Sequence, residues 1–208
     1  MNAEFFALAF IAALNPKLLA LDLLLIENRR PRAMFLCLLL GGMTVALAIG
    51  LLDRHGFSCW IFSGGGTDFM RTWTADGYGL PPHRVIGSVG ETEFRIGDGG
   101  PELVKTAKVG VINDGPQKAS SIHLHVGQRP ILAAGNTDGD LAMLQWTAAS
   151  PYRTLELVVH HTDGDREYAY DRDPILGSGT GQILAAAAEH KWTVIDMAAD
   201  WATVHPDT

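Results

Sequence analysis

Ser63 opens a glycine-rich segment, Ser63-Gly64-Gly65-Gly66, directly after an apolar stretch. A hydroxyl group and a row of free backbone N–H groups at the start of a helix can bind a phosphate group. Sequences of this kind also form plain tight turns, which is their commoner use. The candidate phosphate-binding residues are therefore Ser63, Gly64 and Gly65, with a simple turn as the alternative.

A second candidate site is the loop Gly135–Asp140, with the sequence GNTDGD. It places the amide of Asn136 and the carboxylates of Asp138 and Asp140 directly after a predicted buried strand. Amide and carboxylate oxygens are ligands of hard cations such as Mg²⁺. An acidic turn that caps the following helix explains the same residues equally well.

The elements that must position these residues alternate between strands and helices after Asp53. The predicted strands are Ser58–Phe62, Arg84–Gly87, Pro130–Ala134, Leu155–His160 and Trp192–Asp196. The predicted helices are Thr67–Tyr78, Leu141–Trp146 and Gln182–His190. Thr92–Ile96 and Glu102–Lys105, with glycines between them, predict a hairpin. This order predicts an α/β fold with an open, doubly wound, mostly parallel sheet, in which ligands bind beyond the carboxyl ends of the strands.

Three segments, taken in order, resemble conserved motifs of the haloacid dehalogenase (HAD) superfamily of hydrolases. Phe62–Gly66 resembles motif II, Gln117-Lys118 motif III and Gly135–Leu141 motif IV. The residues around them are similar to one branch of small phosphatase-like members, and the resemblance runs from about residue 54 to 205. It implies a Rossmann-like (Rossmannoid) sheet, Mg²⁺ as cofactor and a phosphorylated small molecule as substrate.

The resemblance also implies roles for single residues. Ser63 would hydrogen-bond a transferring phosphoryl oxygen, and Lys118 would neutralise charge on the nucleophile and the phosphoryl group. Asp140, and with it Asp138 on the same loop, would hold or orient the Mg²⁺ shell. Asn136 stands where an aspartate ligand is usual in the superfamily, and the missing charge should weaken Mg²⁺ binding.

Motif I of the superfamily, which supplies the aspartate nucleophile, has no counterpart in this chain. That motif is an apolar strand ending in Asp-x-Asp-x-Thr/Val. Asp-x-Asp spacings occur at 138/140, 163/165 and 171/173. The first belongs to motif IV, and the other two lack the threonine or valine. We therefore expect an incomplete sheet, with unpaired edges on the two strands that would flank the missing one, and a protein that is catalytically deficient by itself.

The first 53 residues have a different composition from residues 54–208. Ala33–Leu52 contains 20 residues without a charge, enough to cross about 30 Å of hydrocarbon. Phe5–Ile26 is nearly as apolar, but Pro16 and two charged residues interrupt it. We expect a membrane-spanning helical hairpin over residues 1–53, and hence a membrane localisation, with a buried core helix as the alternative for Ala33–Leu52.

The arginines between the two apolar segments bear on topology. If both apolar segments span the membrane, the positive-inside rule places this link in the cytoplasm and residues 54–208 outside. If only the second segment spans it, residues 54–208 would lie inside. The sequence is compatible with either side for residues 54–208. The start of the chain, with Ala13–Lys17 and then Glu27–Arg32 between apolar helices, resembles the GAP-like branch of the lysine-exporter superfamily. Such proteins have about six spans, so we do not expect transport by this chain alone.

Charge narrows the possible partners. Residues 53–208 carry 12 lysines and arginines against 20 aspartates and glutamates, a net charge of −8. A domain this acidic repels a phosphate backbone, so nucleic acid is not an expected partner. His123 and His125 are predicted to share one face of a strand, where a half-buried polar face is the more common arrangement than a metal site.

Three functional hypotheses follow from the sequence. The first is an HAD-like, Mg²⁺-dependent phosphohydrolase by descent that is inactive alone. The second is a membrane protein whose soluble domain binds phosphate or a partner without catalysis. The third is a non-functional remnant of a gene fusion.

Overall fold

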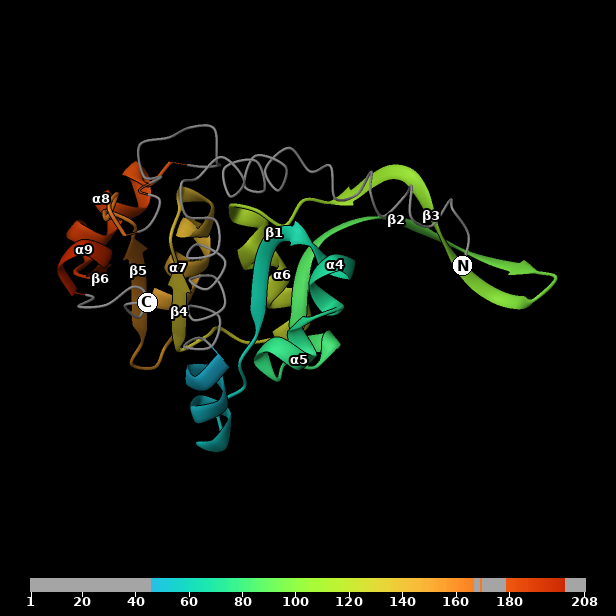
Figure 1. The fold of residues 1–208 in the computed structure, drawn as a ribbon, viewed down its shortest axis with the longest axis horizontal. Helices are drawn as coiled ribbons and strands as arrows, with labels where there is room; N and C mark the ends of the chain where they lie inside the picture. Colours follow the sequence, from blue (N-terminus) through green and yellow to red (C-terminus); the bar gives the residue numbers. More distant parts are fainter. Residues whose placement is uncertain (1–45, 167–168, 170–178, 201–208) are drawn as a thin grey trace.

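The computed structural model describes residues 46–166, 169 and 179–200 (Figure 1). The strands are β1 (Ile61–Gly66), β2 (Val85–Gly97), β3 (Gly100–Val111), β4 (Leu132–Gly135), β5 (Leu155–His160) and β6 (Thr193–Asp196). The helices are α4 (Thr67–Arg71), α5 (Thr74–Tyr78), α6 (Pro116–Val126), α7 (Leu141–Ala148), α8 (Gly181–His190) and α9 (Met197–Asp200), with short 3₁₀ turns η1 (Pro82–Arg84) and η2 (Asp138–Asp140). Residues 46–54 are helical as well.

The strands form two three-stranded sheets rather than one. In the first, β1 pairs in parallel with β2, and β2 pairs antiparallel with β3. In the second, β4, β5 and β6 are all parallel. The protein is therefore a mixed α/β fold with parallel pairing, as predicted, and its sheet is interrupted between β1 and β4. β1 and β4 have one strand neighbour each in the described part of the chain. These two strands carry the candidate motifs II and IV, and they are the strands that we expected to have an unpaired edge where the motif I strand is missing.

A hydrophobic core between the second sheet and its helices connects the two halves. Ala133 of β4 and Val158 of β5 are buried against residues from α6, α7 and α8. Phe62 of β1 packs against the same core, so the first sheet is anchored to it. A smaller core lies under α4 and α5 and is built from Met70, Leu80 and Val85.

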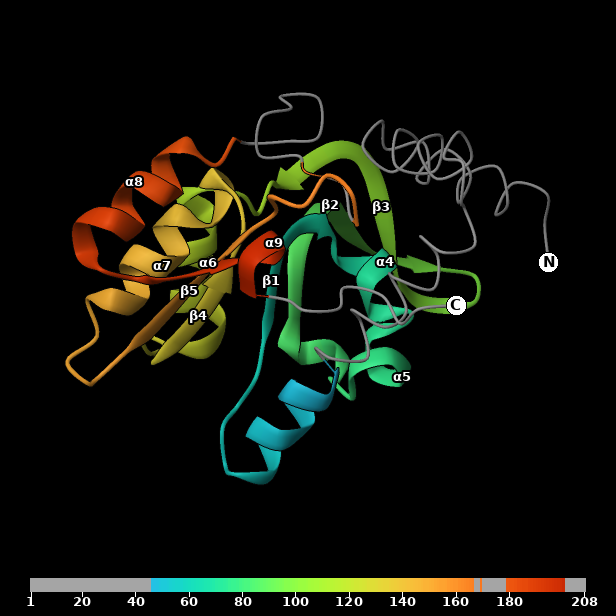
Figure 2. The same ribbon diagram turned by 60° about the vertical axis from the view of Figure 1, so that its left-hand side comes forward.

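The predicted hairpin is confirmed and is longer than the sequence indicated. β2 has 13 residues and β3 has 12, and the pairing runs out to Gly97 opposite Gly100. Asp98-Gly99 forms the two-residue connection, a sequence typical of tight hairpin turns. Figure 1 shows this hairpin projecting well away from the other labelled elements, and Figure 2 shows the same hairpin foreshortened.

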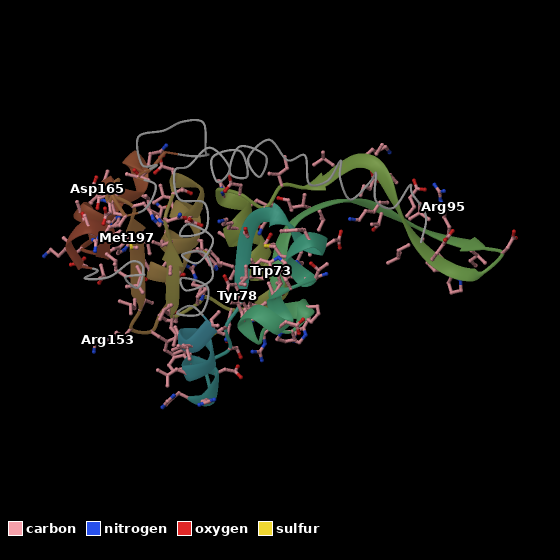
Figure 3. All side chains as sticks on the ribbon, viewed as in Figure 1. Trp73, Tyr78, Arg95, Arg153, Asp165 and Met197 are labelled. Atoms are coloured by element: carbon pink, nitrogen blue, oxygen red, sulfur yellow. The ribbon has the colours of Figure 1, made fainter. Side chains whose placement is uncertain are left out.

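The segment predicted as one helix, Thr67–Tyr78, is two short helices. Trp73 leaves the helical conformation, with φ −129° and ψ −16°, between α4 and α5. Its ring lies 5.3 Å from the ring of Tyr78 in an edge-to-face contact, and both side chains are labelled in Figure 3. This contact between rings five residues apart accompanies the break in the helix.

The strand predicted around His123 and His125 is wrong, because these residues lie in helix α6. Pro116 occupies the first turn, where its missing N–H costs nothing. Gly127 ends the helix with a φ of 76°, in the left-handed region that favours glycine. Residues two apart on a helix do not share a face, so His123 and His125 do not form a joint ligand pair.

The expected membrane hairpin falls largely outside the described residues. Phe5–Ile26 and most of Ala33–Leu52 precede residue 46, and only residues 46–52 of the second segment are described. Within the described part of the chain, every helix is too short or too polar to span a bilayer.

Candidate functional site

Ser63 lies on β1, in an irregular part of the strand. β1 begins at Ile61, later than predicted, and continues through the glycines to Gly66, which pairs with Ser88 beyond a shift in register. The Oγ of Ser63 accepts a hydrogen bond from the N–H of Gly65, at 3.1 Å. The residues predicted to form a phosphate-binding turn therefore form a compact irregularity within a paired strand.

Gly87 on the neighbouring strand makes this conformation possible. A Cβ at Gly87 would overlap the carbonyl oxygen of Gly65 and the side chain of Met70. The Gly87 N–H also donates to the hydroxyl of Thr67, at 2.8 Å. The absence of a side chain on β2 thus lets the glycine-rich part of β1 approach closely.

Asn113, which sequence reasoning missed, connects Ser63 to the neighbouring strand. It is fully buried, and its Nδ2 donates to the carbonyl oxygens of Ser63 at 3.1 Å and Ile86 at 3.3 Å. Its backbone N–H donates to the hydroxyl of Ser88, which in turn donates to the Gly64 carbonyl at 2.8 Å. The only signal in the sequence was a polar residue directly after the apolar pair Val111-Ile112, at the end of β3.

Asp114 follows Asn113 and places a carboxylate against the glycine-rich segment. A Cβ added at Gly64 would lie 3.8 Å from the Asp114 Cγ. The Asp114 carboxylate accepts no hydrogen bond from the described residues, unlike the carboxylates of the Gly135–Asp140 loop. The next residue, Gly115, donates its N–H to the Gly139 carbonyl at 3.0 Å and so ties this loop to the second candidate site.

Lys118 and Asp140 form a buried ion pair between helix α6 and the loop after β4. Each residue has only 6% of its surface exposed, and Nζ lies 2.5 Å from Oδ1. The other carboxylate oxygen of Asp140 accepts the N–H groups of Asn136 at 2.9 Å and Thr137 at 3.2 Å. A Cβ at Gly135 would overlap the Asp140 side chain, so only glycine fits at that position.

Asp138, the remaining acidic residue of the loop, caps helix α8. Its Oδ1 accepts the N–H groups of Gln182 at 2.9 Å and Ile183 at 2.8 Å. Its own N–H donates to the Gly179 carbonyl at 2.7 Å. The structure thus gives Asp138 the capping role, although the helix it caps is α8 and not α7, which follows it in the sequence.

A wide, shallow hollow of about 260 Å³ opens beside this loop. It is lined by Ala134, Gly135, Asn136, Val159 and His161, from the carboxyl ends of β4 and β5. Ligand pockets usually measure about 300 Å³ or more, so this hollow suits a small ligand. Asn136 is the one predicted site residue in its lining; Ser63 and Lys118 lie elsewhere.

The charges around the site favour a cation over an anion. Lys118 carries one positive charge, against one negative charge each on Asp114, Asp138 and Asp140, a sum of −2. Both oxygens of Asp140 and one oxygen of Asp138 already accept hydrogen bonds. Within the described residues no group of three or more His, Cys, Asp or Glu side chains is placed to hold a metal ion. The carboxylates present therefore fit a strong, all-protein Mg²⁺ site poorly.

Two further carboxylates lie at the ends of β5 and β6. The hydroxyl of Thr162 donates to Asp196 at 2.6 Å, and this hydrogen bond, with N–H groups of α9, lowers the pKa of Asp196. Backbone and side-chain hydrogen bonds from Arg166 lower the pKa of Asp163. The carboxylates of Asp163 and Asp196 thus hold loops at the carboxyl edge of the second sheet, the edge that also carries the Gly135–Asp140 loop.

Comparison with known proteins adds no family to this description. No family model matches the chain, and no curated protein matches it. The geometry of the site is therefore the basis for a functional proposal.

Proposed function

We propose that residues 54–208 descend from an HAD-like, Mg²⁺-dependent phosphohydrolase that acts on a phosphorylated small molecule, and that this chain alone is catalytically deficient. The observation that carries the proposal is the buried Lys118–Asp140 ion pair, because it joins the candidate motifs III and IV. The Gly115–Gly139 hydrogen bond and the contacts of Asn113 link the same region to Ser63.

The donors available for a phosphate group support a binding role. The Ser63 hydroxyl accepts from Gly65, and its own proton meets no acceptor in the described residues. A lysine ammonium has three N–H donors, and within the described part of the chain the Lys118 ammonium donates to Asp140 alone. Because the nearby side chains sum to −2, a phosphate would be repelled unless a cation came with it. We therefore propose that Mg²⁺ binds weakly, through Asn136, Asp140 and the phosphate itself, with water completing its shell.

The state of the carboxylates supports catalytic deficiency. A carboxylate nucleophile needs an oxygen free to attack. Asp140 has both oxygens hydrogen-bonded, and the Oδ1 of Asp138 accepts two backbone N–H groups. Asp114 is the remaining carboxylate beside the glycine-rich segment, and it lies on the loop before α6 and not at the end of a central strand.

A phosphatase assay tests the enzymatic part of the proposal. We expect no Mg²⁺-dependent hydrolysis of p-nitrophenyl phosphate by the full chain above the level of a Ser63→Ala, Lys118→Ala double variant. Losing a nucleophile lowers rates by several orders of magnitude. Robust turnover that the double variant abolishes would overturn the deficiency, and Asp114→Asn would then be the first variant to examine.

Phosphate binding without catalysis is the second candidate function. The hydrogen-bond donors that remain on Ser63 and Lys118 favour it. Calorimetric titration of the full chain with inorganic phosphate and Mg²⁺ tests it. Ser63→Ala should weaken binding about tenfold, because one hydroxyl hydrogen bond to a charged group is lost. Ser120→Ala is the matched control, since that hydroxyl lies exposed on α6 and donates to the Pro116 carbonyl. Equal binding by all three proteins would overturn this function.

We further propose that residues 1–53 associate the protein with a membrane. The uncharged stretch Ala33–Leu52 supports this. Recovery of the full-length protein in a stable, soluble form without detergent, as a monomer or as a dimer, would contradict it. A protease-protection experiment on intact cells would then decide the side: we expect residues 54–208 to be digested from outside, following the positive-inside rule.

A further inference from the structure

The β2–β3 hairpin has one apolar and one charged face. Phe94 lies directly opposite Leu103, and Ile96 opposite Pro101. One residue along, Arg95 lies opposite Glu102. Because successive residues of a strand point to opposite faces, the first two pairs share one face and the Arg95–Glu102 pair lies on the other. We call the surface formed by Phe94, Ile96, Pro101 and Leu103 the apolar hairpin face.

The apolar hairpin face is open to solvent. The exposed fractions are 66% for Phe94, 79% for Ile96 and 73% for Leu103. The hairpin projects from the other labelled elements in Figure 1, and Arg95 is labelled along it in Figure 3. In the described residues its strands have no further neighbour beyond β1 at the base of β2. A two-stranded ribbon is only marginally stable alone, so a covered face would stabilise it.

We propose that this face is a self-association surface, which packs against the same face of a second copy of the chain. Contact between identical patches around a two-fold axis is the commonest way in which proteins form dimers. Charge favours a second copy: the hairpin carries four acidic and three basic side chains, a net charge of −1, within a chain of net charge −7. Two hairpins therefore meet with little repulsion, while the acidic bodies stay apart.

The area supports a specific contact. Apolar side chains exposed to this extent present roughly 100 Å² each, so the face measures roughly 400–500 Å² in each copy. Two copies would bury roughly 800–1,000 Å² in total, which approaches the lower limit of about 1,000 Å² for a specific interface. A patch of this size, bordered by charged residues, is also typical of interaction sites on soluble domains.

Two double variants test the proposal on the full-length chain, in detergent micelles with the mass of bound detergent subtracted. Phe94→Gln, Leu103→Gln places a glutamine pair on the apolar hairpin face. Arg95→Gln, Glu102→Gln places the same pair one position along, on the charged face. By sedimentation we expect a dimer for the wild type and the charged-face variant, and self-association weakened about tenfold or more for the apolar-face variant.

Three outcomes would overturn the assignment. They are a monomeric wild type, a dimer that persists in the apolar-face variant, or a dimer lost equally in both variants. Since both substituted pairs are exposed in the monomer, far-UV circular dichroism should be the same for all three proteins.

Cross-linking tests the same contact between two hairpins without removing most of its apolar side chains. Ile96→Cys should cross-link to a second copy with a short bis-maleimide more efficiently than Arg95→Cys, which points to the other face. The wild type, with Cys37 and Cys59, gives the background. Equal cross-linking of both variants would also overturn the proposal. Self-association through this face is independent of any phosphatase activity.

Discussion

The Nζ of Lys118 lies 2.5 Å from the Oδ1 of Asp140, and both residues are almost completely buried. This ion pair joins the first turns of helix α6 to the loop after β4. Asp140 also receives two backbone N–H groups, so its charge is well compensated. The pair therefore stabilises the local fold as well as positioning the two candidate motifs.

We predict that Lys118→Met lowers the free energy of unfolding by about 3–5 kcal/mol, because it leaves the buried Asp140 carboxylate without its counter-charge. Urea unfolding of the full chain measures this. Lys105→Met is the matched control: Lys105 pairs with Asp68, but both side chains are about 60% exposed, so its effect should stay below about 1 kcal/mol. Adding Asp140→Asn to Lys118→Met should recover part of the loss. Similar effects for the two lysine variants would contradict the structural role.

The capping role of Asp138 predicts a loss of stability that does not depend on Mg²⁺. Asp138→Ala removes the acceptor for two N–H groups of α8 and should cost about 1 kcal/mol, whereas Asp138→Asn keeps an acceptor and should cost less. Urea unfolding with Mg²⁺ and with EDTA should give the same difference. A loss seen only with Mg²⁺ would instead assign Asp138 to a metal site. Asp165→Ala, at an exposed position, is the control.

The sequence predicted secondary structure best where an apolar segment is bounded on both sides by turn residues. Leu155–His160 was predicted with the observed bounds, and α8 differs by one residue, because clear turn residues flank both segments. The segment around His123 was misread because Ile122, Leu124 and Val126 alternate with histidines, as in a strand. Pro116 and Gly127 are the stronger signals, since they fit the first turn and the end of a helix.

The candidate site was only partly predictable for a different reason. Ser63, Asn136 and Asp140 were proposed from local sequence patterns and Lys118 from the resemblance to motif III, and the structure joins Lys118, Asn136 and Asp140. Asn113 acts through contacts with residues 27 and 50 positions away, which no local pattern indicates. The close approach that Gly87 permits is likewise a property of the folded sheet, so the course of β1 through its glycines could not be read from the sequence.

The lowered pKa of Asp196 predicts a pH-dependent contribution to stability. The Thr162 hydroxyl and N–H groups of α9 stabilise the charged carboxylate in the folded state. The contribution is therefore fully present above the unfolded pKa, about 3.9, and is lost as the pH falls through the lower pKa of the folded state. Asp196→Asn should be less stable than the wild type at pH 7, and the difference should shrink steadily below about pH 4. Urea midpoints between pH 7 and pH 3 measure it, with the exposed Asp76→Asn as control; a difference that does not change with pH would contradict the assignment.

Asp114 gives the sharpest prediction for the site. Its carboxylate lies against Gly64, where a bound phosphate would meet the Ser63 hydroxyl, and it carries the same sign of charge. Two like charges several ångströms apart in a solvated site repel by about 0.5–1 kcal/mol. Asp114→Asn should therefore tighten the binding of inorganic phosphate about two- to fivefold in calorimetric titrations, and added salt should reduce the gain. Asp98→Asn, in the distant turn of the β2–β3 hairpin, removes the same charge and should leave binding unchanged. Weaker binding by Asp114→Asn would mean that this carboxylate helps to hold a cation with the phosphate, and its repulsive role would be wrong.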